Sequence, residues 1–271
     1  MTTTPKSSAG SESATKYDNN GQYSRNGILR YEKIFGPGYI STGGQETTDA
    51  LVARLGNHLK PGARVIDVGS GIGGAAFDLA KRFGVKVVGV DLAPEMIAIA
   101  HERAREANVG DSVEFQIADI MTTDFDQPFD IVWSRDALMH IHDKPALFKR
   151  LYDLLKPGGR LVVTDYARGT GPGSPEYQAY IKKTGYHVID PASYGKLLEG
   201  AGFVDVVAED ATDQFIAIMH REAEQLKATR AEFVQMFSEE DAQYLIDRWA
   251  MKDGFCKAGD QKWGIFKADK R

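Results

Sequence analysis

A glycine-rich turn between two apolar runs carries the clearest chemical signal in the sequence. Residues 67–74 read DVGSGIGG and directly follow the apolar pair Val65 and Ile66. A tight turn from a strand into a helix adopts backbone angles that a Cβ atom disfavours, and it lets a ligand approach the bare backbone. Asp91 ends a second apolar run, where a carboxylate can accept hydrogen bonds from ribose hydroxyls. The segment therefore predicts a nucleotide-binding strand, turn and acidic partner.

Acidic residues near this turn distinguish two classes of ligand. The glycine spacing also fits the G-x-G-x-x-G pattern of enzymes that bind pyrophosphate dinucleotides. However, Asp67 precedes the first glycine, where it would repel a pyrophosphate but can accept a hydrogen bond from an ammonium group or hold the loop. Asp119 ends another short apolar run and, with Ile120, can bracket an adenine. Three carboxylates around one cavity suit a cationic ligand such as S-adenosylmethionine.

A second group of polar residues follows the fourth apolar run. Asp136 and His140 are four residues apart in the segment SRDALMH, and on a helix this spacing places both side chains on one face. Taken singly, the pair is also compatible with a surface contact. Tyrosines occur at a strand end and in two segments outside the strand and helix alternation: Tyr23, Tyr39, Tyr166 and Tyr186. Packing explains any one of them, but together they predict a small pocket that binds an anion and presents ring faces to a cation.

Apolar runs alternate with segments of helical period from residue 64 onward, which is typical of a parallel sheet covered by helices. The predicted strands cover residues 64–66, 86–90, 113–117, 131–134, 160–165, 204–208 and 263–268. The predicted helices include residues 94–107, residues 146–155 ending at the turn KPGG, and a long polar helix over 213–236. The fold class is therefore α/β, with a Rossmann-like, seven-stranded, mostly parallel sheet. We expect one domain over residues 17–271, lid segments at 17–50 and 167–190, and a disordered tail at 1–16.

Composition narrows the classes of partner. The 271 residues are 42% hydrophobic, which is enough to bury one large core. The net charge of −5 and the absence of a Lys/Arg block argue against a nucleic-acid partner. The single cysteine, Cys256, excludes an internal disulfide and a thiolate metal cluster. The N-terminal residues lack the apolar segment of a signal peptide or membrane span. We expect a cytoplasmic monomer without a metal and without stable membrane insertion.

Several short motifs resemble the phosphoethanolamine N-methyltransferases, over residues 17 to the C-terminus. They are Tyr23, NGILRYEKIFG (26–36), YISTGG (39–44), SRD (134–136), TDY (164–166), GY (185–186) and QKWG (261–264). The glycine turn alone fits any class I methyltransferase, whereas ISTGG and SRD are far more selective. The resemblance implies a class I fold and an S-adenosylmethionine-dependent enzyme that methylates phosphoethanolamine stepwise to phosphocholine.

The resemblance also implies roles for individual residues. The cofactor pocket would contain Gln22, Ile40, Ser41, Gly69, Asp91, Leu92, Asp119, Ile120, Ser134 and Arg135, to which the glycine turn adds Asp67 and Gly71. The catalytic residues would be a dyad of Tyr23 and His140, with Asp136 binding the substrate amine. The substrate phosphate would contact Tyr23, Tyr166, Tyr186 and Lys252, together with the side chain at position 184.

Position 184 departs from the family pattern. The family has an arginine two residues before the tyrosine that is Tyr186 here, whereas this chain has Thr184. Threonine cannot offer a phosphate the charged, two-pronged donor of a guanidinium. We expect acceptor identity to depend on this position, with Lys182 or Lys183 turning inward to compensate.

Three other functions stay open on the residues alone. The first is an S-adenosylmethionine-dependent methyltransferase of another small amine, amino acid or thioether that lacks the phosphate. The second is a nicotinamide-dependent oxidoreductase, which leaves Asp67, Asp119 and the ISTGG segment unexplained. The third is a non-catalytic cofactor sensor, which the joint presence of Tyr23, Asp136 and His140 disfavours.

Overall fold

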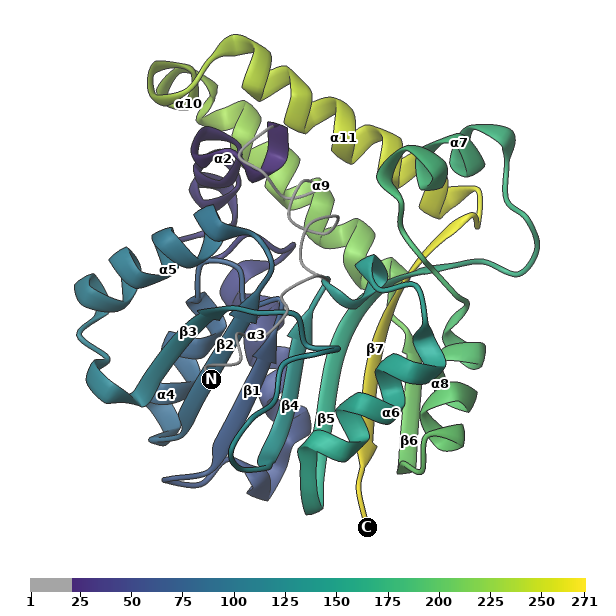
Figure 1. Cartoon of the computed structure of the whole chain (residues 1–271). Coiled ribbons are helices and arrows are strands. Elements are labelled where there is room, and N and C mark those ends of the chain that lie inside the picture. The colour runs from purple at the N-terminus through teal and green to yellow at the C-terminus, as the bar shows by residue number, and fades with distance from the viewer. Residues whose placement is uncertain (1–20) are drawn as a thin grey trace, which may run out of the picture.

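Seven strands form one sheet in the computed structural model, which describes residues 21–271 (Figure 1). They are β1 (Arg64–Val68), β2 (Lys86–Asp91), β3 (Val113–Ile117), β4 (Phe129–Arg135), β5 (Leu155–Arg168), β6 (Val204–Asp210) and β7 (Gln261–Asp269). Their spatial order is β3-β2-β1-β4-β5-β7-β6. Strand β7 is antiparallel to both neighbours and the other pairs are parallel. The predicted mostly parallel, seven-stranded α/β fold is confirmed.

Helices pack on both faces of the sheet and across one end of it (Figure 1). On one face lie α3 (Gly44–Leu55), α4 (Gly74–Phe83) and α5 (Pro94–Ala107), and on the other lie α6 (Lys144–Leu154) and α8 (Pro191–Gly200). The remaining helices are α2 (Arg25–Phe35), α7 (Pro175–Thr184), α9 (Thr212–Ala228), α10 (Arg230–Met236) and α11 (Glu239–Lys257). Figure 1 shows α2, α9, α10 and α11 grouped above the sheet, with α7 beside the end of α11.

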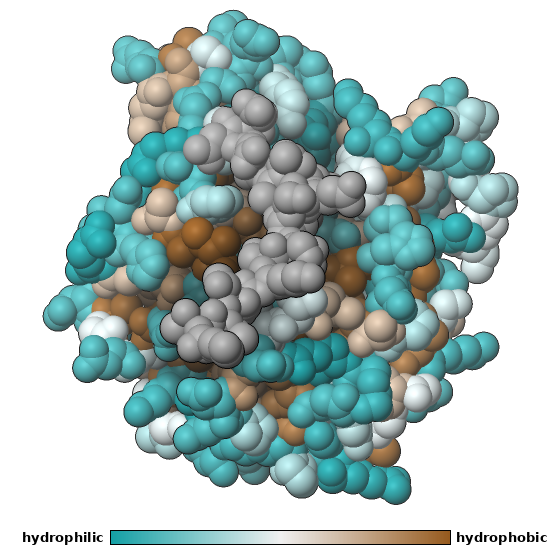
Figure 2. Space-filling model, in the orientation of Figure 1, coloured by the Kyte–Doolittle hydropathy of each residue, from teal (hydrophilic) through white to brown (hydrophobic). Residues whose placement is uncertain are grey.

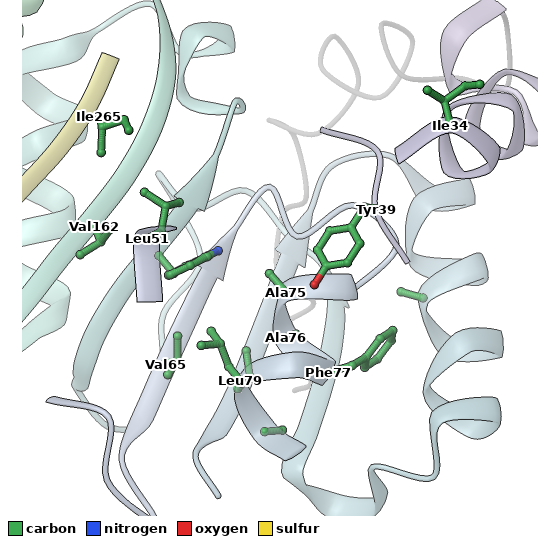
Figure 3. Close-up of a cluster of buried hydrophobic side chains, with 14 of the residues drawn as sticks. Ile34, Tyr39, Leu51, Val65, Ala75, Ala76, Phe77, Leu79, Val162 and Ile265 are labelled. Carbon is green, nitrogen blue, oxygen red and sulfur yellow. The ribbon is translucent and has the colours of Figure 1, made fainter. Parts of the chain in front are cut away.

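The pleat of the central strands explains why there are two cores. Successive side chains of a strand point to opposite faces of the sheet. Val65 of β1 therefore joins the core under α3 and α4, whereas its neighbour Ile66 joins the core under α6 and α8. Figure 3 shows the first core, in which side chains from α3 and α4 meet those of β1, β5 and β7.

Side-chain caps and prolines fix where three of the helices start. The carboxylate of Asp143 accepts a hydrogen bond from the N–H of Ala146 at the start of α6, and Asp190 accepts one from Ser193 at the start of α8. Ser174 caps α7 in the same way. Each cap is followed by a proline in the first turn, where the missing N–H costs no helical hydrogen bond.

Two predicted element boundaries are wrong. The KPGG segment belongs to β5, which begins at Leu155, because Gly158 and Gly159 exchange backbone hydrogen bonds with Lys270. The helix predicted over 213–236 is two helices, α9 and α10. They meet at Thr229, whose φ of −106° and ψ of 16° depart from helical values.

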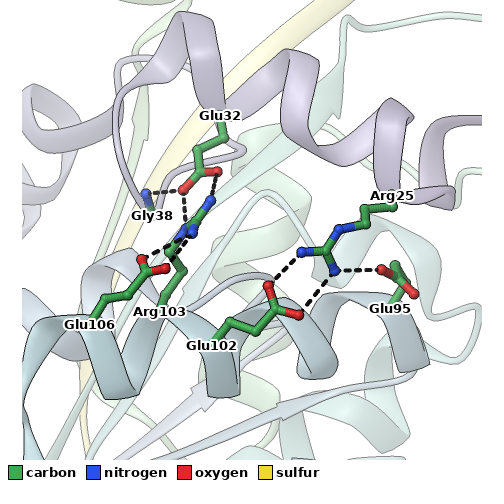
Figure 4. Close-up of polar contacts among 7 residues, drawn as sticks. All are labelled: Arg25, Glu32, Gly38, Glu95, Glu102, Arg103 and Glu106. Atoms are coloured by element: carbon green, nitrogen blue, oxygen red, sulfur yellow. Dashed lines mark hydrogen bonds and ion pairs between the residues drawn. The ribbon is translucent and has the colours of Figure 1, made fainter.

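The N-terminal segment is attached to α5 by ion pairs (Figure 4). Arg103 of α5 donates from Nε and Nη2 to the two carboxylate oxygens of Glu32 on α2, at 2.8 and 2.7 Å. Glu32 also accepts from the backbone N–H of Gly38, at 2.8 Å. A second group joins Arg25 to Glu95 and Glu102. These contacts hold α2 and the chain that follows it beside α5.

Several expectations are not decided by the fold. The tail predicted at 1–16 lies outside the described residues. The single domain, the lid role of residues 17–50 and 167–190, the monomeric state and the cytoplasmic location stay predictions. Within residues 21–271, no helix combines the length and apolar character needed to cross a bilayer.

Candidate active site

A cavity of about 230 Å³ lies at the carboxyl ends of β1, β2, β4 and β5. The strand order reverses between β1 and β4, and open α/β sheets bind ligands outside the strand ends at such a point. The N-terminal segment before α2, the turn after β4 and helix α11 complete the wall. Figure 2 shows hydrophobic residues gathered near the middle of this face and hydrophilic residues around them.

The glycine turn forms one side of the cavity. Gly69 has a φ of 71°, and a Cβ atom there would lie 2.2 Å from the Cβ of Ala137, so only glycine fits. The N–H of Gly71 donates to Oδ2 of Asp91 at 3.0 Å, and the N–H of Ala93 donates to Oδ1 at 2.9 Å. Burial raises the pKa of Asp91 while these N–H groups act to lower it. The turn and the first residues after β2 thus orient the Asp91 carboxylate at the cavity edge.

Most of the residues predicted for a cofactor pocket line this cavity. Oδ1 of Asp119 accepts from the N–H of Met121 at 2.9 Å, which fixes the carboxylate, and Ile120 is buried beside it. The other lining residues from that prediction are Gln22, Ile40, Ser41, Gly69, Asp91, Leu92 and Arg135. They come from five separate segments of the chain, which the fold brings to one cavity.

Arg135 lines the cavity, but its guanidinium binds the protein. It donates to the carbonyl oxygens of Thr42 and Gly44, each at 2.8 Å, and to the hydroxyl of Thr48 at 2.9 Å. Arg135 therefore ties the segment before α3 to the end of β4. Its observed contacts are those of a positioning residue, and its contact with a cofactor stays a prediction.

Three other residues predicted for the cofactor pocket lie outside the main cavity. Ser134 is fully buried, and its hydroxyl donates to the carbonyl of Val68 at 2.7 Å, so it joins β4 to β1. Gly71 orients the carboxylate of Asp91, to which its backbone N–H donates a hydrogen bond. Asp67 is buried below the glycine turn and lines a smaller neighbouring pocket. Burial raises the pKa of Asp67 to about 7, which the nearby Arg135 acts to lower.

Asp136 has a buried carboxylate oxygen available for a ligand. Its backbone φ is 51°, so Asp136 and His140 do not share a helix face as predicted; Asp136 precedes a short 3-10 turn, Leu138–His140. Oδ1 accepts a hydrogen bond from Nε1 of Trp263 at 2.8 Å. Oδ2 is buried and has no hydrogen-bond partner among residues 21–271. An unpaired buried acceptor is costly, so this oxygen suits a donor that a ligand brings.

His140 contacts two of the predicted tyrosines. Its Nε2 lies 3.4 Å from the hydroxyl of Tyr23, and its ring meets that of Tyr186 edge-on, with centroids 5.1 Å apart. These contacts join the N-terminal segment, the turn after β4 and the chain after α7. The dyad predicted from the family pattern is within reach of a hydrogen bond.

Two buried charges hold the turn that carries His140. Lys144 donates to the carbonyl oxygens of Leu138 and Ile141, at 2.6 and 3.0 Å. Oδ1 of Asp165 accepts from the N–H of Met139 at 3.0 Å. Burial raises the pKa of Asp165 to about 7, while Lys144 acts to lower it. Neither residue has a predicted role: Asp165 lies in the motif TDY beside the predicted Tyr166, and Lys144 carries no signal in the sequence beyond the proline that follows it.

Tyrosines and a lysine form the other end of the cavity. Tyr166, Tyr186 and Lys252 all line it. Nζ of Lys252 donates to the hydroxyl of Tyr166 at 2.5 Å and lies 4.5 Å from the centroid of that ring. Burial, together with the nearby charge of Arg248, lowers the pKa of Lys252 to about 7.

Known proteins resemble this chain in sequence and in structure. A methyltransferase-domain family model matches residues 59–202. The phosphoethanolamine N-methyltransferase of Plasmodium falciparum (isolate 3D7) is 34% identical over 93% of this chain and 94% of its own length. Phosphoethanolamine N-methyltransferase 1 of Arabidopsis thaliana is 45% identical over 94% of this chain and 51% of its own. The chain thus spans about half the length of the plant relatives it matches.

A solved structure of similar fold also comes from a phosphoethanolamine N-methyltransferase. Haemonchus contortus phosphoethanolamine N-methyltransferase 2, in complex with phosphomonomethylethanolamine and S-adenosylhomocysteine, superposes with a TM-score of 0.91. It is 33% identical, and the match covers 96% of this chain and 60% of that one. The chain belongs to the phosphoethanolamine N-methyltransferase family. Among the alternatives left open by the residues, the family therefore favours a methyltransferase.

In this member of the phosphoethanolamine N-methyltransferase family, position 184 does not reach the cavity. The hydroxyl of Thr184 donates to the carbonyl oxygens of Tyr180 and Ile181, at 3.0 and 3.2 Å, as threonine commonly does within a helix. Lys182 and Lys183 are exposed. The expectations that Thr184 binds substrate and that a neighbouring lysine compensates are therefore corrected.

Two further residues of the site had no role predicted from the sequence. Trp263 lies in the motif QKWG but had no assigned role, and it orients Asp136 through its indole N–H. Arg248 lines the cavity one helical turn before Lys252. The available signal was the spacing of four residues between two cations on one helix, which places them on one face.

Proposed function

We propose that this chain transfers methyl groups from S-adenosylmethionine to the nitrogen of phosphoethanolamine, stepwise to phosphocholine. One observation carries the proposal: the cavity combines the unpaired Oδ2 of Asp136 with the cation of Lys252. Within the described residues, Lys252 has no carboxylate within ion-pair distance. This arrangement suits a small molecule with a positive and a negative end.

The relatives support the same acceptor. The solved nematode enzyme binds phosphomonomethylethanolamine, which is a phosphobase with one methyl group on nitrogen. Curated relatives that cover more than nine-tenths of this chain carry the name phosphoethanolamine N-methyltransferase.

The residues around the glycine turn fit S-adenosylmethionine. Asp91 is oriented to accept from ribose hydroxyls, and Asp119 with Ile120 offers a polar and an apolar group to an adenine. Bound S-adenosylmethionine supplies the electrophilic methyl group. Gly69, which must be glycine because Ala137 packs against it, presents its backbone at the edge of the same cavity.

His140 and Asp136 address the main obstacle to methylating an amine. The nitrogen must be unprotonated, yet an amine with a lysine-like pKa of about 10.4 is free base to roughly one part in a thousand near pH 7, a handicap of about 4 to 5 kcal/mol. We assign His140 as the proton acceptor, with Tyr23 as its hydrogen-bonded partner. Asp136 orients the nitrogen and offsets the positive charge that grows on it during transfer.

The substitution Asp136→Asn tests this assignment. An amide still accepts from Trp263 but loses the negative charge, so kcat/KM for phosphoethanolamine should fall by about 10- to 150-fold, the worth of a charged hydrogen bond. Affinity for S-adenosylhomocysteine, measured by calorimetry, should stay within about twofold. Asp153→Asn, which removes an exposed carboxylate on α6, is the matched control. Wild-type turnover by Asp136→Asn would refute the role.

A further inference from the structure

Helix α11 places two cations at the tyrosine-lined end of the cavity. Arg248 and Lys252 are four residues apart on this helix, and both line the cavity. Nη1 of Arg248 donates to the hydroxyl of Tyr244 at 3.1 Å. Of the ion pairs among residues 21–271, none includes either cation.

This pair is unfavourable without an anion. Like charges at this spacing on a helix repel each other, and partial burial weakens the screening by water. Arg248 contributes to the low pKa of Lys252, after burial itself. Asp136 and Glu222 act in the opposite direction on Lys252, but among residues 21–271 neither carboxylate lies within ion-pair distance of Lys252 or Arg248. A dianionic ligand group would relieve the repulsion.

Several tyrosines lie close to the guanidinium of Arg248 at this end of the cavity. Tyr31 and Tyr186 line the same cavity. The guanidinium acts to lower the pKa of Tyr186 against burial, which raises it, so the two groups interact. Tyr186 belongs to the cluster on which α7 and α11 meet, together with Tyr180 and Phe255. A guanidinium from α11 therefore reaches the tyrosines that flank position 184.

We propose that Arg248 binds the phosphate of the acceptor together with Lys252, and thereby sets the preference for phosphorylated over unphosphorylated amines. The guanidinium provides the planar, two-pronged donor that position 184 does not supply here. Lys252 adds a point charge beside it. This inference rests on the proposed function, because it assigns the anion-binding half of the same cavity.

The test measures the affinity for phosphocholine by calorimetry, in the presence of S-adenosylhomocysteine. Phosphocholine has no ionisable amine, so its binding does not depend on deprotonation of the nitrogen. Arg248→Met should weaken binding by about 10- to 150-fold, and Arg248→Lys, which keeps the charge but loses the fork, should lie in between. The matched control is Lys257→Met, which removes an exposed cation from the same helix and should stay within about twofold.

Turnover distinguishes this role from a structural one. Arg248→Met should lower kcat/KM for phosphoethanolamine about as much as it lowers phosphocholine affinity, with kcat/KM for ethanolamine and S-adenosylhomocysteine affinity little changed. The inference is overturned if Arg248→Met or Arg248→Lys binds phosphocholine as tightly as the wild type, or if either loses as much affinity for S-adenosylhomocysteine as for phosphocholine. In that case the proposed function still stands, provided that the wild type methylates phosphoethanolamine. If the wild type neither methylates phosphoethanolamine nor binds phosphocholine, the proposed function fails first.

Discussion

His140 is the residue on which the proposed proton transfer depends. Its Nε2 is within reach of the Tyr23 hydroxyl, its ring packs against Tyr186, and Lys144 holds its turn through two carbonyl oxygens. A side chain so restrained loses little freedom when it meets the substrate nitrogen. The sequence motif placed His140 at the cavity, but the restraint by Lys144 became visible only in the fold.

Replacement of His140 should slow turnover in a pH-dependent way. We expect His140→Ala to lower kcat by about 10² or more, with little change in S-adenosylhomocysteine affinity. The fraction of free amine rises tenfold with each pH unit below the amine pKa, so a proton acceptor matters less at high pH and the loss should shrink. Rate profiles from pH 7 to 10 measure this, with the exposed His142→Ala as control. Parallel profiles for variant and wild type would contradict the role.

Among the elements, the segment before α3 is held from two sides. Arg135 at the end of β4 binds the carbonyl oxygens of Thr42 and Gly44, and Oε1 of Glu222 on α9 accepts from the N–H of Gly43 at 2.7 Å. Burial raises the pKa of Glu222 to about 7, which its hydrogen bond from Gly43 acts to lower. This contact links the N-terminal wall of the cavity to the C-terminal helices, and its strength should depend on pH.

The variant Glu222→Gln tests this contact. Because burial raises the pKa of Glu222 above the usual glutamate value of 4.5, the stabilisation by protonated Glu222 is complete below about pH 4.5 and is lost as the pH rises through about 7. Glutamine keeps the acceptor and does not ionise, so the variant should match the wild type at pH 4 and exceed its free energy of unfolding at pH 8 by about 1 to 3 kcal/mol. Urea unfolding measures this, with the exposed Glu224→Gln as control. An equal difference at both pH values would refute it.

The sequence predicted elements better than their junctions. All seven strands were predicted because apolar runs bounded by turn residues favour buried strands, and α5 was predicted with both ends because Pro94 marks its first turn. The strand residues at 155–159 were missed because their hydrogen bonds to the distant Lys270 decide them. The break at Thr229 was missed because no glycine or proline marks it in the sequence. Asp136 was predicted to lie on a helix because its spacing to His140 fits one. The φ of Asp136 is 51°, which is incompatible with a right-handed helix.

At the scale of the whole molecule, the cavity combines residues that are far apart in the chain. Tyr23 precedes α2, Asp136 follows β4 and Lys252 lies on α11. The resemblance to the family implied the roles of these three residues, although only Tyr23 and Asp136 belong to the motifs that carry it. Arg248 could not be recognised in the same way, because a charged residue in a long polar helix is usually exposed to solvent. In the fold, α11 packs against the tyrosine cluster and Arg248 lines the cavity.

One measurement tests the central claim most directly: product mass spectra from the purified chain, supplied with S-adenosylmethionine and, separately, with ethanolamine, phosphoethanolamine and its mono- and dimethyl forms. The account predicts that phosphoethanolamine gains one, two and then three methyl groups, ending at phosphocholine, while ethanolamine at the same concentration is methylated far more slowly. Methylation of ethanolamine with no product from phosphoethanolamine at millimolar concentration would contradict the account.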